Sequence, residues 1–267
     1  MTAVDIQPGV PTPAQKAVKN SGGGLVGTLK ANYDLLVAPV IVVIGLIVML
    51  VYVGNQTLDT IEQRALEPSN VFGQLGQHLL LTAYSTVLVL IIAVPVGILL
   101  SRPSARRIQG FVLALGGFAQ ALPPFGVLLL LGFWEFGVRS AVIGLTLAAL
   151  LPVLRNTVVG LQQVDQSLIE AARGMGMSSR QTLFRVEIPL AVPVIVAGLR
   201  VALVLNVGTA TLATYIGAGG LGELVQQALR LNRINVLLVA GAIIATVALL
   251  IDWLAGVVER IVVTRSG

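Results

Sequence analysis

Long apolar runs constrain this chain more than any other feature of its sequence. A helix needs about 20 consecutive apolar residues to cross a lipid bilayer. Six runs approach or exceed this length, and Arg200 is the one charge inside them: Leu35–Val53, Leu79–Leu100, Ile108–Trp134, Ser140–Leu154, Ile188–Gly222 and Ile234–Ile251. We therefore predict an all-α integral membrane protein with about six transmembrane helices, over residues 35–53, 79–101, 108–134, 140–161, 189–215 and 235–257.

Composition agrees with this class and excludes several others. Only 11% of the residues are charged and 56% are hydrophobic, whereas soluble domains carry roughly 25% charged residues. The chain has no cysteine and a single histidine, His78, which argues against a thiolate or His-rich metal site and against a Ser-His-Asp triad. We expect no catalytic residue, no metal site and no cofactor bound by this chain.

The first thirty residues differ from the rest. They are rich in proline and glycine and contain Lys16, Lys19 and Lys30, a composition that buries too little apolar surface to fold alone. The sequence therefore predicts a flexible cytoplasmic tail over 1–30 and a transmembrane domain over 31–267. A cleaved signal peptide is not expected, since the first apolar run starts late and is of full membrane length.

Basic residues predict the orientation in the membrane. Short cytoplasmic loops are enriched in lysine and arginine. With the N-terminus inside, twelve of the 17 basic residues fall in cytoplasmic segments, four fall outside (Arg64, Arg139, Arg230, Arg233) and Arg200 lies within a span. The excess of basic residues is therefore explained by the topology of a cell-membrane protein with both termini cytoplasmic. We expect the lipid bilayer, and no nucleic acid, as a partner.

The connection over 162–189 is longer than the others and carries a recognisable pattern. Asp165 or Ser167 is placed to cap a short helix around Glu170, and Gly174 and Gly176 are placed to end it. Ser178 or Ser179 is placed to cap a second helix. Composition alone leaves open whether the first helix sits in another protein's groove or lies on lipid.

The spacing within this loop resembles a known family. Glu170-Ala171-Ala172, three residues, Gly176, nine residues and then Val186-Glu187-Ile188-Pro189 resemble the EAA loop of binding-protein-dependent ABC importer permeases, with Val for Ile and Ile for Leu in the last element. Segments from about Gln77 to Arg260 look like the glycine betaine, carnitine and choline branch of that family, which imports osmoprotectants.

The resemblance implies a fold and a set of partners. The fold would be the MetI-like fold of type I importers, and 162–189 would be the coupling loop. ATP and Mg would bind a separate ATPase, since the chain has no GxxxxGK[ST] loop. The other partners would be a second permease copy or a paralogue and a separate extracytoplasmic substrate-binding protein. The ATPase would be contacted by Glu170, Ala171, Ala172, Arg173, Gly174 and Gly176.

The fifth span is the candidate for the translocation path. Polar side chains inside a membrane are costly and often functional, although packing between helices through small residues and hydroxyls is the alternative. The candidate path residues are Asn206, Thr209, Thr211, Thr214 and Tyr215, with Asn206 the strongest. A broken element near the outer face, a candidate gate, is indicated by Gly217, Gly219, Gly220 and Gly222.

Two further features bear on substrate and stability. Aromatic faces generally hold quaternary amines, yet aromatic residues make up only 5% of the chain, so no complete cage is visible and selectivity is expected in the binding protein. Arg200 is expected to be structural, with Asp252 and Glu259 as candidate partners.

Other functions stay open at this point. Within the family, a methionine or phosphonate permease would share the loop and the glycine-rich segment. An ion-coupled secondary transporter would show inverted repeats and carboxylates deep in the membrane, neither of which the sequence contains. A membrane scaffold would not need the spaced EAA pattern.

Overall fold

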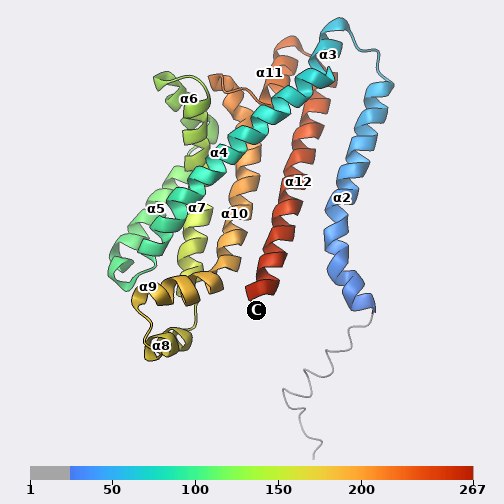
Figure 1. Cartoon of the computed structure of the whole chain (residues 1–267). Coiled ribbons are helices and arrows are strands. Elements are labelled where there is room, and N and C mark those ends of the chain that lie inside the picture. The colour runs from blue at the N-terminus through green and yellow to red at the C-terminus, as the bar shows by residue number, and fades with distance from the viewer. Residues whose placement is uncertain (1–24, 267) are drawn as a thin grey trace, which may run out of the picture.

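The computed structural model describes residues 25–266 of the chain, and the side chains of residues 36–264. All elements in this part of the chain are helical, and both long and short helices occur (Figure 1). The α-helices are α2 Leu25–Gly54, α3 Thr60–Ala65, α4 Pro68–Leu100, α5 Arg106–Ala121, α6 Pro124–Trp134, α7 Val138–Gln162, α8 Gln166–Gly174, α9 Ser179–Thr182, α10 Ile188–Ala210, α11 Gly222–Leu231 and α12 Ile234–Ser266. Short 3₁₀ helices span Pro103–Ala105 and Thr211–Ile216, and a π-helical turn spans Leu183–Glu187.

Five continuous helical segments are long and apolar enough to cross a membrane, or six if the bent pair of α5 and α6 counts as one span. The prediction of about six spans is therefore confirmed. The α2 helix begins at Leu25, so the last six residues of the predicted tail, 25–30, are helical. Residues 1–24 of that tail lie outside the described residues.

The predicted single span over 108–134 was wrong in shape. The segment folds as two helices, Pro103–Ala121 and Pro124–Trp134, that meet at an angle of 90°. Leu122 precedes Pro123 and has an extended backbone (φ −66°, ψ 136°), as the steric demand of a following proline requires. Pro123 and Pro124 also lack the N–H groups that would continue the hydrogen-bond ladder. Hydropathy identified an apolar stretch here and gave no information about its direction.

The second span begins earlier than its apolar run. α4 starts at Pro68, eleven residues before the predicted start at residue 79. Its first turns contain buried polar residues that each form one hydrogen bond inside the protein, while Gln74 Oε1 and His78 Nδ1 have no hydrogen-bond partner in the described part of the chain. Gln74 Nε2 donates to Asn70 Oδ1 at 3.1 Å, and His78 Nε2 donates to the carbonyl oxygen of Val207 at 3.0 Å. The helix therefore continues through residues that a hydropathy criterion leaves out.

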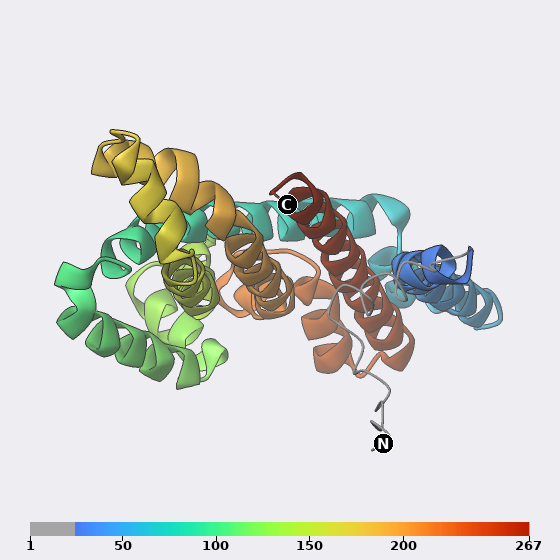
Figure 2. The same ribbon diagram turned by 90° about the horizontal axis from the view of Figure 1, so that it is seen from below.

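The long helices form a layer with one helix crossing it. Seen from the end that carries α8 (Figure 2), α5, α7, α10, α12 and α2 follow one another, and α4 lies across one face of α7 and α10. The contact between α7 and α10 is close because Gly198 carries no side chain. A Cβ added there would lie 2.7 Å from Asn156 Cβ and 2.9 Å from the carbonyl oxygen of Pro152.

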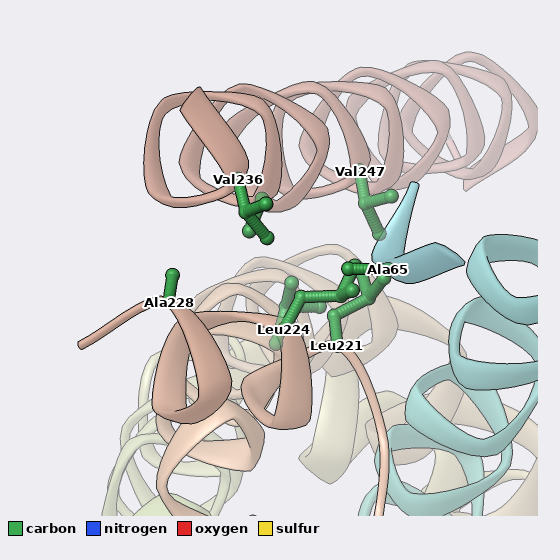
Figure 3. Packing of buried hydrophobic residues seen from close by; sticks show 8 residues of the cluster. Ala65, Leu221, Leu224, Ala228, Val236 and Val247 are labelled. Atoms are coloured by element: carbon green, nitrogen blue, oxygen red, sulfur yellow. The ribbon is translucent and has the colours of Figure 1, made fainter. Parts of the chain in front are cut away.

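At the end of the layer opposite α8, an apolar cluster joins α3, α10, α11 and α12. Leu221 and Leu224 near the start of α11 point towards Val236 and Val247 of α12, with Ala65 of α3 beside them (Figure 3). The same end is closed by polar contacts: Tyr52 Oη of α2 donates to Asn235 Oδ1 at 2.9 Å, and Arg233 pairs with Asp59 at 2.6 Å. The α2–α3 connection is thus fixed to the start of α12.

Candidate coupling loop and membrane path

Helix α8, which carries the EAA residues, is defined by caps at both ends. The Asp165 carboxylate accepts a hydrogen bond from the backbone N–H of Ser167 at 2.9 Å, so Asp165 rather than Ser167 is the N-cap. Hydrogen bonds from the Ser167 backbone and side chain hold the pKa of Asp165 below its usual value. The helix ends at Gly174, and Gly176 follows with a φ of +84°, a left-handed conformation that favours glycine.

The second loop helix, α9, has a reciprocal cap. Ser178 Oγ accepts from the backbone N–H of Gln181 at 3.4 Å, and the backbone N–H of Ser178 donates to Gln181 Oε1 at 2.9 Å. Ser178 rather than Ser179 is therefore the cap residue. Through the π-helical turn, α9 continues directly into α10, so the loop is mechanically joined to the long helix that follows it.

The two faces of α8 differ in exposure. Ile169 and Ala172 are buried, and α8 packs against α9 and the π-helical turn. An adjoining face exposes Leu168, Ala171 and Met175, which share one stripe at helical spacing and of which Met175 directly follows the helix. Glu170 is exposed as well. Of the predicted contact residues, Ala172 thus points into the protein, whereas Glu170, Ala171, Arg173, Gly174 and Gly176 are exposed. Leu168 and Met175 were expected to supply apolar contacts around Glu170 but were not among the predicted ATPase-contact residues, although the i, i+3, i+7 spacing of the stripe was available.

An ion pair that the sequence reasoning missed fixes the loop to the rest of the protein. Arg102, just after α4, donates through Nη2 and Nη1 to the two carboxylate oxygens of Glu187 at 2.7 and 3.2 Å. Glu187 is 6% exposed and ends the π-helical turn. The only sequence signal was a carboxylate placed directly before a membrane span.

Arg200 has the partners that the sequence predicted. Its Nε and Nη2 donate to the Asp252 carboxylate at 2.7 and 2.8 Å, and its Nη1 donates to Glu259 at 3.2 Å. The three side chains join α10 to α12 on the half of the bundle nearer to α8. A bidentate pair of this kind fixes the orientation as well as the distance of the two helices.

The candidate path residues do not lie together on one surface. Asn206 is fully buried, and its Nδ2 donates to Thr86 Oγ1 of α4 at 3.1 Å. Thr214 is also buried, and the ring of half-buried Tyr215 packs edge-on against Phe125 with centroids 5.1 Å apart. Thr211 Oγ1 is buried without a hydrogen-bond partner in the described part of the chain. These four residues take part in contacts between helices.

Thr209 is placed differently from the other candidates. It lines a cavity of about 150 Å³ between the α5–α6 bend, α7 and α10, and Gln120 lies in the same wall. Gln120 was not among the predicted path residues. The signal for it was present, since it is a polar side chain within the uncharged 108–134 run.

The glycine-rich segment after α10 is a tight connection at the end of the bundle opposite α8. Gly217, Gly219 and Gly220 have positive φ angles of 74°, 78° and 91°. The backbone N–H of Gly220 donates to Gln77 Oε1 of α4 at 3.1 Å. Gly222 starts α11, and a Cβ there would collide with the carbonyl oxygen of Thr211. The predicted irregular element is therefore present, and it is held by backbone geometry.

The layered helical fold, its bent span and its EAA-bearing loop define a multi-pass membrane transport subunit. The chain belongs to the family of binding-protein-dependent transport system inner membrane components, whose sequence pattern matches residues 93–263. This assignment confirms the predicted family and rules out the ion-coupled transporter and the scaffold as classes.

Individual relatives refine the comparison. The chain is 38% identical over 194 residues to the carnitine transport permease protein OpuCD of Listeria monocytogenes, covering 72% of this chain and 86% of the relative. It is 39% identical over 214 residues to the osmoprotectant import permease protein OsmY of Salmonella typhimurium, covering 79% and 89%. A structure of the MetNI methionine ABC transporter in an inward-facing conformation superposes with a TM-score of 0.66 at 23% identity, covering 77% of this chain and 99% of that one. The predicted MetI-like fold and the osmoprotectant branch are confirmed.

Proposed function

We propose that this chain forms the membrane path of an ATP-driven importer for small quaternary amines, the class that includes carnitine, choline and glycine betaine. Relatives that match most of the chain are named for carnitine and for osmoprotectants. The likeness to the methionine transporter is at 23% identity and concerns the fold alone. Catalysis belongs to a partner: ATP and Mg bind a separate ATPase, and this subunit is not an enzyme.

The observation that carries the proposal is the two-faced helix α8. Its exposed stripe of Leu168, Ala171 and Met175 suits a groove on the ATPase, because a short amphipathic helix buries such a stripe when it docks. Glu170 lies beside the stripe and pairs with a basic group on the partner. Ala172 is buried and packs α8 against the rest of the protein. Gly174 and Gly176 allow the chain to turn away directly after the contact, and Arg173 is exposed beside them.

The coupling loop faces the cytoplasm in this proposal. The start of α2 and the end of α12 lie at the same end of the bundle as α8 (Figure 1). This agrees with the bias of basic residues, twelve against four, towards one side of the membrane. Both termini are then cytoplasmic, and the glycine-rich segment faces outward, where it serves as part of the outer gate.

The substrate path is proposed to run past the α5–α6 bend. Irregular backbone is tolerated at membrane depth where it lines a cavity, and the cavity with Gln120 and Thr209 lies at this bend. Asn206, Thr211, Thr214 and Tyr215 shape the path indirectly through helix packing. A second copy of the chain or a paralogue completes the channel, and a separate extracytoplasmic binding protein supplies the selectivity.

The coupling part is tested with Glu170→Lys in the assembled transporter. The account predicts ATP hydrolysis that no longer drives uptake, with normal membrane insertion, because reversing this charge disturbs the contact with the ATPase. Glu67→Lys, at the opposite end of the bundle, reverses the same charge away from the loop and is the matched control. Uptake at the wild-type level in Glu170→Lys would contradict the assignment of α8.

A further inference from the structure

A polar cavity of about 700 Å³ lies behind the coupling loop, between the α4–α5 corner, the end of α7 and α8. Its wall contains three guanidinium groups and one carboxylate: Arg102, Arg106, Arg173 and Glu187. These residues come from four separate segments of the chain. Neither the docking stripe of α8 nor the path at the α5–α6 bend includes this cavity.

The charges in the cavity do not balance. Arg102 and Glu187 neutralise one another through their two hydrogen bonds. Arg106 and Arg173 have no acidic partner within 4 Å in the described part of the chain. The amides that share the wall are neutral, and Gln162 Nε2 is already engaged with Gln109 Oε1 at 3.0 Å. Two exposed positive charges without an acidic partner therefore line one partly open cavity.

The start of α5 adds to this field. The helix has 16 residues, no side-chain cap and no acidic residue in its first turn, and it begins with Arg106 itself. The 3₁₀ turn Pro103–Ala105 precedes α5, and the carbonyl oxygen of Pro103 accepts from the backbone N–H of Arg106, so the contribution of the helix to anion binding here is its dipole rather than free N–H groups. Because the positive charge of Arg106 lies at this position, the empty site is electrostatically unfavourable, and a bound anion is stabilised.

We propose that this cavity binds a phosphate group, held by Arg106 from α5 and Arg173 from α8. Guanidinium groups bind phosphate oxygens through paired N–H donors, and two of them, from two different helices, line this one cavity. The phosphate is either that of an anionic phospholipid headgroup or a soluble phosphate. Because Arg173 belongs to α8, a bound phosphate would also restrain the coupling helix; this consequence rests on the proposed function, whereas the binding itself does not.

The test compares two double variants of the full-length chain in nanodiscs. Arg106→Gln with Arg173→Gln removes both cavity charges. Arg107→Gln with Arg180→Gln removes the same net charge from neighbouring positions that do not line the cavity. Retention of phosphatidylglycerol against phosphatidylcholine is measured by native mass spectrometry, and binding of inorganic phosphate is measured by calorimetry at low ionic strength. Thermal unfolding of each variant verifies that it is folded.

The cavity variant should bind at least about tenfold more weakly than the wild type, since each lost charge-assisted contact is worth about that factor. The control variant should bind as the wild type does. Preference for phosphatidylglycerol supports the proposal with lipid as the source, and binding of inorganic phosphate alone supports it with a soluble source. The proposal would be overturned if the wild type neither preferred phosphatidylglycerol nor bound inorganic phosphate. It would also be overturned if the two double variants lost binding to the same extent. Either negative result leaves the coupling and transport proposals untouched.

Discussion

Arg102 and Glu187 lie 85 residues apart in sequence and form a two-point ion pair at 2.7 and 3.2 Å. The pair joins the corner between α4 and α5 to the turn that leads from the coupling loop into α10. Glu187 is 6% exposed and Arg102 is 33% exposed, so the contact is partly screened from water. The loop is thereby joined to two transmembrane segments.

Breaking this pair should loosen the loop. Glu187→Gln leaves a half-buried guanidinium without its charged partner, and we expect a loss of about 2 kcal/mol in the free energy of unfolding. Thermal or denaturant unfolding of the purified protein measures it. Arg102→Gln should cost a similar amount, and the double variant should cost clearly less than the sum of the two. Strict additivity would show that the two side chains do not interact.

Neighbouring alanines on α8 should respond in opposite ways. Ala171→Glu places a charge on the exposed stripe and should weaken co-purification of the ATPase while leaving the melting temperature unchanged. Ala172→Glu places the same charge at a position that is 1% exposed and should destabilise the loop itself. Affinity pull-down and thermal unfolding separate the two effects. The same outcome for both variants would contradict the assigned faces of α8.

The cap of α8 should be insensitive to pH in the physiological range. The Asp165 carboxyl has its pKa lowered by hydrogen bonds from Ser167. Because the pKa of Asp165 is lower in the folded state than in the unfolded state, the cap stabilises the helix fully at any pH above the unfolded-state pKa. This stabilisation is lost only as the pH falls through the folded-state pKa. Hydrogen exchange of α8, corrected for intrinsic rates, should give constant protection between pH 5 and 8. Asp165→Ala should reduce that protection, and Asp165→Asn should retain most of it. A loss of protection between pH 7 and 5 would contradict this.

Two glycines near the end of the bundle opposite α8 should differ sharply in tolerance to substitution. Gly222→Ala forces a Cβ into the carbonyl oxygen of Thr211, a backbone atom that cannot move aside, so we expect little folded protein. Gly208→Ala meets no atom within 4 Å and should change the stability by no more than about 1 kcal/mol. Yield of monodisperse protein after detergent extraction is the measurement. Normal yield of the Gly222→Ala variant would show that α11 can shift away from Thr211.

The sequence predicted those features that depend on local composition. The apolar runs predict membrane spans because a helix must be apolar over the thickness of the bilayer, and the spacing from Glu170 to Pro189 is local enough to identify the EAA loop. Asp252 and Glu259 were predictable partners for Arg200, because a guanidinium within a membrane span needs a carboxylate and both lie near one end of the last span.

Features that depend on direction or on long-range contact were not predictable in this way. Hydropathy measures how apolar a segment is and not its direction, so it did not predict the 90° bend between α5 and α6. Pro123 and Pro124 were the sequence signal for that bend. The EAA spacing does not show that Ala172 faces inward, and nothing local connects Arg102 to Glu187. Asn206 was singled out as a polar group in the membrane, and the structure provides it with Thr86 from a helix 120 residues away in sequence.

Uptake by the reconstituted transporter tests the central claim most directly. The full chain, its ATPase and its binding protein are placed in proteoliposomes, and ATP-dependent accumulation of labelled carnitine, choline, glycine betaine and methionine is compared. The account predicts accumulation of at least one of the three quaternary amines and none of methionine. Accumulation of methionine alone would contradict it.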